Sequence, residues 1–275
     1  MPELPEVETT RLGLLPYLKG ARIQRLEVRE RRLRWDIPEF LSELLVGYVV
    51  RDITRRGKYL LVYCCKNRNC GHLLLHLGMS GSLRVLTHPL PPGKHDHVDI
   101  VLASGVCIRY TDPRRFGAML WVDGDAGEHP LLSALGVEPF SEEFTGDCLF
   151  SASRGKQVAI KQLLMNSRVV TGIGNIYANE ALYHAGIHPR LAAGKVSRRR
   201  CDRLAQSVKD TLERALKAGG SSIRNFVGSN GEAGYFQLEY WTYGREGLPC
   251  KRCQTPIRSL RQGQRSSFFC PQCQR

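Results

Sequence analysis

The sequence predicts a multidomain α+β protein with an N-terminal β-sandwich, a helical domain and a C-terminal zinc-binding hairpin. Three observations support this prediction. Short apolar runs bounded by Gly and Pro fill the first half of the chain, as is typical of antiparallel β structure. After residue 153 the apolar period lengthens to that of helices. Near the C-terminus, two Cys-x-x-Cys pairs have the spacing of a structural zinc site.

The composition indicates a polyanionic partner. Lys and Arg outnumber Asp and Glu by 40 to 26, which gives a net charge of +14. Nucleic acid fits this surplus better than an anionic membrane, because no basic amphipathic anchor helix stands out. No apolar stretch is long enough to span a bilayer, and no signal peptide is evident. With part of the cysteines in a metal pattern, we expect a protein of the reducing cytoplasm.

Residues 1–8 combine two prolines with three carboxylates, which predicts a poor helix start and a poor strand. Removal of Met1 is expected and leaves Pro2 as a free secondary amine, with a pKa of roughly 7.7–8.0 that keeps part of it neutral near pH 7. Such an amine can attack an aldehyde-like carbon and form a cationic iminium. Glu3 lies beside it as a proton donor or acceptor. The alternative interpretation is a frayed acidic terminus.

The rest of the first half predicts one helix followed by strands. A helical apolar period covers residues 9–19, and Gly20 ends it. The short strands that follow indicate a β-sandwich or a barrel. The predicted strands are Ile23 to Val28, Gly47 to Ile53, Lys58 to Tyr63, His72 to Leu77, Ser82 to Leu86, Val98 to Leu102, Val106 to Tyr110 and Ala118 to Val122.

The second half predicts helices. One contains Ile160, Leu163 and Leu164, a second is opened by the run from Val170 to Asn175, and a third covers Ser197 to Ala218. Glycines 172 and 174 precede the second helix, and glycines at a helix N-terminus expose backbone N–H groups that suit a phosphate. Polar residues before this half predict a connection, with one short helix around Leu131 to Leu135. The predicted parts are a β-sandwich (2–122), the connection (123–150), a helical domain (151–235) and a hairpin domain (236–275).

The spacing of cysteines near the C-terminus is the strongest indication of a chemical site that residue spacing alone provides. The pattern Cys-x2-Cys-x16-Cys-x2-Cys predicts a tetrahedral site for one structural zinc ion. The segment between the two pairs is too short for much beyond a β-hairpin. Residues 245–275 contain seven Lys or Arg and one Glu, so this hairpin is expected to lie along DNA. The predicted ligands are Cys250, Cys253, Cys270 and Cys273.

Two further clusters raise metal hypotheses. On a strand, His95 and His97 would share a face and could ligate one ion together. Residues 64–72 hold three Cys and one His, which could bind zinc or form a disulfide between Cys65 and Cys70. We favour a solvated extension of a hairpin loop there, because the spacing is not that of a known zinc finger.

The first residues, Pro2-Glu3-Leu4-Pro5-Glu6-Val7-Glu8, resemble the start of bacterial formamidopyrimidine-DNA glycosylase, a base-excision enzyme that removes oxidised purines. The run from Gly172 to Glu180 is similar to the family's helix–two-turns–helix motif, and the resemblance continues to the last residues. It implies a helix–two-turns–helix domain with a zinc-finger β-hairpin. It also implies a monomer that flips an oxidised purine out of damaged double-stranded DNA and nicks the strand by β,δ-elimination.

The resemblance further implies roles for individual residues. Pro2 is the nucleophile, Glu3 protonates the sugar ring oxygen and Glu6 supports proton movement. Lys58 and Arg265 contact phosphates at the lesion, and Arg265 is linked to the second strand cleavage. The residues that fill the space of the flipped base are Met79, Arg114 and Phe116. The other DNA contacts are His95, Lys156, Lys161, Asn175 and, in a lid loop over the base, Arg224.

Two other functions are alternatives. Endonuclease VIII, the sister enzyme for oxidised pyrimidines, usually begins Pro-Glu-Gly-Pro-Glu, whereas Leu4 and the motif from Asp112 to Phe116 favour the purine enzyme. A zinc DNA-binding protein without catalysis would need the same basic surface and hairpin. It would have no use for a free Pro2 next to Glu3.

Overall fold

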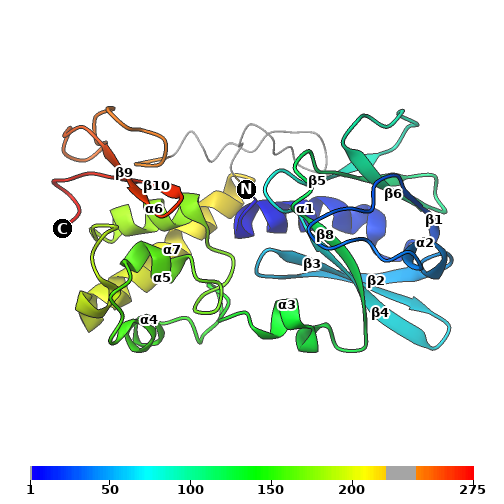
Figure 1. The fold of residues 1–275 in the computed structure, drawn as a ribbon, viewed down its shortest axis with the longest axis horizontal. Coiled ribbons are helices and arrows are strands. Elements are labelled where there is room, and N and C mark those ends of the chain that lie inside the picture. Colours follow the sequence, from blue (N-terminus) through cyan, green and yellow to red (C-terminus); the bar gives the residue numbers. More distant parts are fainter. Residues whose placement is uncertain (1, 221–239) are drawn as a thin grey trace. The chain divides into compact units, whose positions relative to one another are not determined.

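The computed structural model describes residues 2–220 and 240–275, which divide into two units (Figure 1). The first unit comprises Met1–Ser133 with Ala218–Tyr235, and the second comprises Ala134–Lys217 with Phe236–Arg275. Each unit buries its own set of apolar side chains. In the described part of the chain, no helix combines the length and the apolar character that a membrane span needs.

Helix α1 (Leu4–Leu18) begins at Leu4 rather than at residue 9. The prediction that the prolines prevent a helix at the start of the chain was therefore wrong. Pro5 lies in the first turn, where its missing N–H has no helical acceptor in any case. The carboxylate of Glu6 accepts a hydrogen bond from the backbone N–H of Glu3 at 2.8 Å, which caps the helix start.

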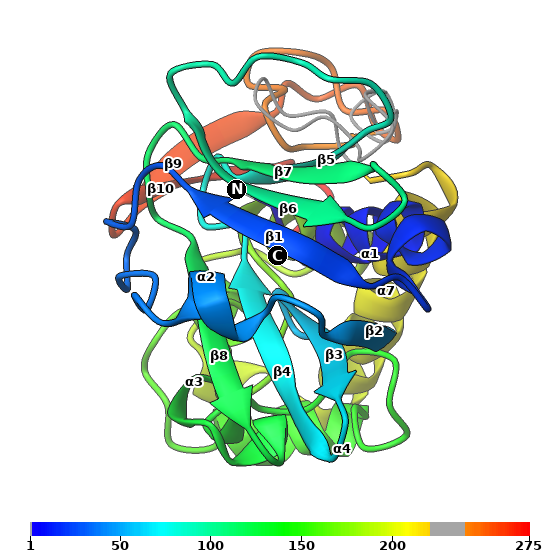
Figure 2. The same ribbon diagram turned by 90° about the vertical axis from the view of Figure 1, so that its right-hand side faces the viewer.

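Two antiparallel four-stranded sheets make up most of the first unit, and Figure 2 shows them as separate layers. The first sheet has the order β1 (Ile23–Val28), β6 (Asp96–Leu102), β7 (Cys107–Thr111) and β5 (Ser82–Leu86). The second has the order β2 (Val49–Arg56), β3 (Tyr59–Lys66), β4 (Asn69–His76) and β8 (Ala118–Asp123). Helix α2 (Leu41–Leu44) lies between β1 and β2 in the chain. The predicted β-sandwich is confirmed, and there is no single closed barrel in this unit's described residues.

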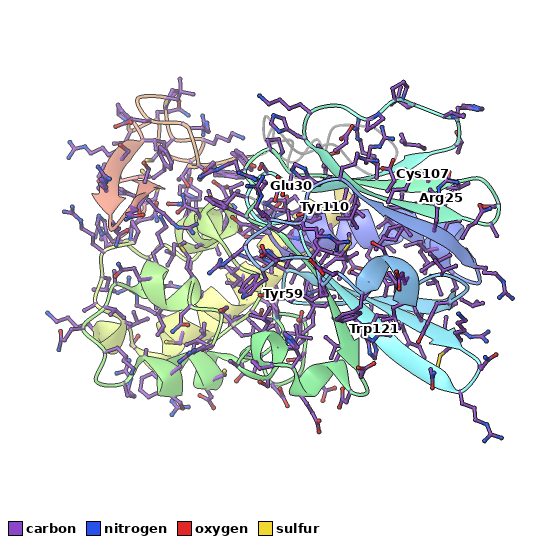
Figure 3. All side chains as sticks on the ribbon, turned by 45° about the vertical axis from the view of Figure 1, so that its right-hand side comes forward. Arg25, Glu30, Tyr59, Cys107, Tyr110 and Trp121 are labelled. Carbon is purple, nitrogen blue, oxygen red and sulfur yellow. A yellow bond between two sulfur atoms is a disulfide. The ribbon has the colours of Figure 1, made fainter. Side chains whose placement is uncertain are left out.

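The core of the first unit forms because alternate residues of its strands point to the same face. Leu60, Val62 and Cys64 of β3 are buried, and so are Ile100 of β6 and Tyr110 of β7. Figure 3 marks Tyr110 in the interior of this unit. Helix α1 packs against β2, β3 and β5, which belong to both sheets. The start of α1 is thereby held against the sandwich.

The cysteine-rich segment at residues 64–72 is not a loop extension, so that interpretation was wrong. Strands β3 and β4 stay paired as far as Lys66 and Asn69, and a two-residue turn joins them. Cys65 and Cys70 face each other across this ladder and form a disulfide. The zinc hypothesis for this segment also fails, because a disulfide removes two of the three thiols as metal ligands.

The second unit is helical, and a short connection leads to it. The connection, part of the first unit, contains η1 (Ala126–Glu128) and α3 (Pro130–Ser133). The helices of the second unit are α4 (Gly146–Ser153), α5 (Ile160–Leu164), α6 (Asn175–His184), η2 (Ala193–Lys195) and α7 (Arg198–Lys217). Helix α7 packs against α4 and α6, and α5 packs against α6. The exposed face of α7 is strongly charged, whereas Leu204, Val208 and Leu212 are buried, as expected for an amphipathic helix.

The chain ends in the predicted hairpin, in which β9 (Arg258–Gln262) pairs with β10 (Arg265–Phe269). Strand β10 packs against helix α6 of the same unit. A small apolar cluster joins Tyr183 of α6 to Ile257 and to the cysteines Cys250 and Cys270. Two strands of this length need such support, because an isolated hairpin is marginally stable in water.

Candidate functional site

The two predicted acidic catalytic residues are buried at the start of α1. Glu3 and Glu6 have almost no exposed surface, and Pro2 is buried beside them. The Glu6 carboxylate accepts a hydrogen bond from the Glu3 backbone N–H. The backbone carbonyl of Glu6 accepts one from the Thr10 hydroxyl at 2.8 Å. A helix N-terminus carries partial positive charge, which suits two carboxylates. The structure thus places the predicted nucleophile and its proton donor at one rigid helix end.

Lys58 lies in the turn between β2 and β3, not within a strand as predicted. Arg56 pairs with Tyr59, so Gly57 and Lys58 form a two-residue turn, and Gly57 takes the positive φ of 58° that such a turn favours. Arg55, the neighbour of this turn in β2, has its Nε 3.1 Å from Glu8 Oε2. Because Glu8 belongs to α1, this ion pair links the turn of Lys58 to the helix of Pro2 and Glu3.

His76, at the end of β4, lies beside the same turn. Its ring is 4.7 Å from that of Tyr59, and its Nδ1 accepts from the backbone N–H of Gly78 at 3.0 Å. Burial, together with the nearby charges of Lys58 and Arg34, lowers the pKa of His76 to about 4. His76 is therefore neutral at pH 7, as its acceptor role requires.

We expect His76 to make stability fall with decreasing pH. Its pKa rises on unfolding to an ordinary value near 6.5, so between that pH and about 4 the unfolded chain binds more protons. Titration of His76 should cost on the order of 1–3 kcal/mol of the free energy of unfolding across this range. Urea denaturation at pH 7 and at pH 4.5 measures this loss in the free energy of unfolding. The His76→Gln variant should show a smaller loss, and an equal loss in both proteins would contradict the assignment.

The three side chains predicted to replace the flipped base lie on two loops that the structure ties together. Gly78 has a φ of 59°, and a β-carbon there would lie 2.4 Å from the Phe116 carbonyl carbon. Met79 and Phe116 are 37% and 43% exposed, unusual values for large apolar side chains. The Arg114 guanidinium lies 4.8 Å from the centre of the Phe116 ring. The two loops that carry this cluster of exposed side chains therefore meet at Gly78 and Phe116.

Asp112 stabilises the two loops that carry this cluster. Its carboxylate, fully buried, accepts from the Ser80 hydroxyl at 2.8 Å and from the Gly117 backbone N–H at 2.9 Å. The Arg114 backbone N–H donates to the Ser80 hydroxyl at 3.2 Å. One buried carboxylate therefore fixes the geometry of both loops.

The metal hypothesis for His95 and His97 was wrong. His97 is buried and its Nε2 lies 2.8 Å from the Asp112 carbonyl oxygen, so this nitrogen is not directed at an ion. Asp96, between the two histidines, is engaged by Thr111 and Arg84. His95 is half-exposed and keeps a surface on which it can meet a partner.

The four predicted zinc ligands converge in the second unit. Their sulfur atoms all lie within 4.8 Å of one another, and the Cys253 Sγ is 3.4 Å from that of Cys270 and 3.5 Å from that of Cys273. Four thiolates at 2.3 Å from one ion are about 3.8 Å apart, so this set fits a tetrahedral zinc ion. Tyr183 lies with its hydroxyl 3.1 Å from the Cys250 Sγ, which helps to orient the ligand.

The other predicted DNA contacts of this unit gather near the hairpin. Arg265 begins β10 and is exposed, and Asn175 begins α6. The Asn175 side-chain amide donates to the Ser266 carbonyl at 3.1 Å, next to Arg265 in the chain. A cavity of about 230 Å³ lies between α5 and this hairpin, and Arg265 lines it. Lys156 is exposed in the loop between α4 and α5.

Lys161 does not face a DNA groove with Lys156, so that prediction was wrong. Its side chain is 1% exposed, and its ammonium group donates to the Ser266 carbonyl at 2.9 Å and to the Ser267 hydroxyl at 2.7 Å. A buried cation needs such partners, which explains its position. Lys161 therefore holds the strand that carries Arg265. Arg224 and its lid loop lie outside the described residues.

Two interactions are not among those that the sequence predicts. Glu180 of α6 is buried and accepts from the backbone N–H groups of Trp241, Thr242 and Tyr243 at 2.8–3.0 Å. It fixes the segment that leads into the hairpin. The sequence does contain an indication of this interaction, because Glu180 is a carboxylate within an apolar helical run and a buried carboxylate requires hydrogen-bond partners. The Arg55–Glu8 pair had no such signal, because both residues read as solvated charges.

Comparison with known proteins agrees with this geometry. Residues 1–119 match the formamidopyrimidine-DNA glycosylase N-terminal domain, residues 135–227 match its H2TH domain, and residues 247–275 match a zinc finger found in FPG and IleRS. The chain is 55% identical to the formamidopyrimidine-DNA glycosylase of Ralstonia pickettii, and 54% identical to that of Pseudomonas fluorescens. Both alignments cover 100% of each chain.

Solved structures give the same result. The crystal structure of MutM (Fpg) from Thermus thermophilus superposes with a TM-score of 0.87 at 36% identity, covering 99% of this chain and 98% of that one. The complex of Lactococcus lactis Fpg with Fapy-dG-containing DNA gives a TM-score of 0.90 at 33% identity, covering 99% and 100%. These full-length matches, together with the buried Pro2–Glu3 helix end and the clustered cysteines, show that the chain belongs to the formamidopyrimidine-DNA glycosylase family.

Proposed function

We propose that this protein excises oxidised purines, 8-oxoguanine and formamidopyrimidines, from duplex DNA and then nicks the abasic site. The observation that carries the proposal is the helix end where Pro2 lies beside the buried carboxylates of Glu3 and Glu6. Relatives that align with this chain over their full length are named formamidopyrimidine-DNA glycosylase. We further propose that it acts as a monomer in the bacterial cytoplasm, where the chromosome is its substrate.

Base release begins when the Pro2 nitrogen forms a bond to C1′ of the damaged nucleotide. The N-glycosidic bond breaks, and the base leaves with the bonding electrons and takes up a proton whose movement Glu6 supports. Glu3 donates a proton to the ring oxygen as the C1′–O bond opens. The Pro2 nitrogen loses its N–H proton once the bond to C1′ has formed, which balances the proton that the base takes up. The freed nitrogen lone pair then completes a cationic iminium that joins enzyme and DNA.

Strand cleavage uses the iminium as an electron sink. It acidifies the C2′ protons, and loss of one of them expels the 3′ phosphate by β-elimination. A second elimination expels the 5′ phosphate. Lys58 and Arg265 contact phosphates beside the lesion, and guanidinium and ammonium groups stabilise the departing anions.

DNA is held mainly through its backbone. His95, Lys156 and Asn175 are the proposed phosphate contacts, and such contacts fix register without reading sequence. Met79, Arg114 and Phe116 enter the duplex where the damaged base is extruded, because an apolar wedge and a guanidinium replace the lost stacking and pairing. The zinc ion, held by the four cysteines, stabilises the hairpin and takes no part in the chemistry.

Borohydride trapping on an 8-oxoguanine duplex, followed by peptide mass spectrometry, tests this function. We expect one covalent adduct on the amine of Pro2, with Met1 absent. An undamaged duplex is the control and should give no adduct. Tight DNA binding without any adduct would leave the non-catalytic alternative, and an adduct on Lys58 would reassign the nucleophile.

Substrate preference separates the remaining alternative. Excision of 8-oxoguanine and of thymine glycol is compared on duplexes of the same flanking sequence. We expect clear preference for 8-oxoguanine. Preference for thymine glycol would assign the protein to the endonuclease VIII type.

A further inference from the structure

Arg55 occupies an unusual position for a charged side chain. It is the penultimate residue of β2, and its side chain is only 12% exposed. Its Nε lies 3.1 Å from Glu8 Oε2, and its Nη1 donates to the Gly57 carbonyl oxygen at 2.9 Å. The planar guanidinium presents these donors in a fixed fork, so a single group binds two acceptors from different elements.

The position of the Gly57 carbonyl oxygen affects the orientation of Lys58, the next residue of the turn. It belongs to the peptide unit that joins Gly57 to Lys58, and a peptide unit is rigid and planar. Fixing the oxygen therefore fixes the plane from which the Lys58 Cα projects. This bond adds to the strand pairing of Arg56 with Tyr59, which flanks the turn, and its loss removes a direct restraint on that plane. Figure 3 marks Tyr59, the first residue after the turn.

Glu8 anchors the other side of Arg55. It lies in α1, and Arg11 of the same helix also binds it, with Nη2 2.7 Å from Oε1. Burial raises the pKa of Glu8, but the hydrogen bonds and charges of Arg11 and Arg55 outweigh this, so its pKa is lowered. Glu8 is thus a permanent carboxylate near neutral pH. It connects the guanidinium to the helix whose N-cap residue is Glu3, which Pro2 directly precedes in the chain.

We propose that Arg55 is a positioning residue that sets the direction of Lys58 relative to Pro2 and Glu3 through its simultaneous bonds to Gly57 and Glu8. The inference rests on the proposed function, because Lys58 and Pro2 act there on the same nucleotide. It assigns Arg55 no contact with DNA. The residue acts on the reaction only through the turn.

Arg11 provides a matched control. It binds the same carboxylate as Arg55, and it also donates to a backbone carbonyl, that of Ile53 at 3.2 Å. Ile53 lies within the β2–β3 ladder, away from the turn of Lys58. Removing Arg11 therefore takes away one guanidinium and its hydrogen bonds to Glu8 without removing the Arg55 bond to the Gly57 carbonyl.

The test measures single-turnover excision of 8-oxoguanine at saturating enzyme. Arg55→Ala is expected to slow excision roughly tenfold to a hundredfold, since misplacing a catalytic group has effects of this size. Arg11→Ala is expected to stay within about twofold of wild type. Arg55→Lys should fall between wild type and Arg55→Ala, because an ammonium is a point donor that cannot reproduce the fork.

A double variant distinguishes positioning from general stabilisation. If Arg55 acts through Lys58, adding Arg55→Ala to Lys58→Ala should change the rate of the latter by less than about twofold. The same loss in the Lys58→Ala background as in wild type would overturn the inference, and so would equal slowing by Arg11→Ala. If Arg55→Ala does not fold, as judged by circular dichroism, Arg55→Lys takes its place in the cycle.

Failure of the proposed function would look different. In that case the wild-type protein itself would form no borohydride adduct with the 8-oxoguanine duplex, whatever the variants do. A wild-type adduct with an additive cycle rejects only the role of Arg55.

Discussion

A chain that carries extra residues in front of Pro2 is expected to lose base excision by roughly a thousandfold or more. The extension converts the secondary amine of Pro2 into a tertiary amide, whose nitrogen lone pair is delocalised and whose N–H is gone. Neither attack on C1′ nor an iminium is then possible. The helix end offers no substitute, because Glu3 and Glu6, its other buried polar groups, are carboxylates.

A cleavable leader makes this a controlled comparison. The leader ends directly before Pro2, so protease treatment of the same preparation restores the free amine. Excision of 8-oxoguanine under single-turnover conditions, with mass spectrometry of the N-terminus, is measured before and after cleavage. Equal rates before and after cleavage would show that Pro2 is not the nucleophile. DNA affinity is measured in parallel, and an extended protein that still binds identifies the loss as chemical.

Removal of zinc is expected to abolish DNA binding, with roughly a hundredfold or greater loss of affinity. The apolar cluster under the hairpin is small, and two five-residue strands do not hold together alone. Zinc bound by four thiolates contributes about 10–16 kcal/mol to the folding of such a unit. Without the ion, the strand that carries Arg265 separates from Asn175 and Lys161, which bind it at Ser266.

Cys253→Ser provides the genetic form of this experiment, and Cys148→Ser is its control, since Cys148 lies in α4 and is not among the four clustered sulfurs. Metal content, circular dichroism and fluorescence anisotropy with a labelled duplex are measured on both variants. We expect Cys253→Ser to lose its zinc and its affinity while helical signal is retained. A metal-free variant that binds DNA as tightly as wild type would contradict the role of the hairpin.

Patterns of neighbouring residues in the sequence were sufficient to predict much of the architecture. The eight strands were predicted because their apolar residues alternate between Gly and Pro boundaries, and pairing then follows from the need to bury one face of each sheet. The zinc site was predicted because its ligand spacing is a property of adjacent residues. The roles predicted for Pro2, Glu3, Met79 and Phe116 come from family motifs that are continuous in the chain.

Capping of a helix start and pairing between strands decided the rest. The start of α1 depends on Pro5 lying where no N–H is needed and on the bond between Glu6 and Glu3, which outweighs the poor helix propensity of the prolines. The cysteine-rich segment became a paired hairpin because β3 and β4 continue to Lys66 and Asn69, which brings Cys65 opposite Cys70.

The sequence by itself determined the fold class, the family motifs and the metal ligands, because each depends on neighbours along the chain. Only the tertiary structure decided which charges are buried. Lys161 and Arg55 resemble surface cations in the sequence, yet one holds the zinc hairpin and the other ties the turn of Lys58 to α1. The reason is physical: burial of a charge depends on partners that folding brings from far away, and no local pattern specifies them.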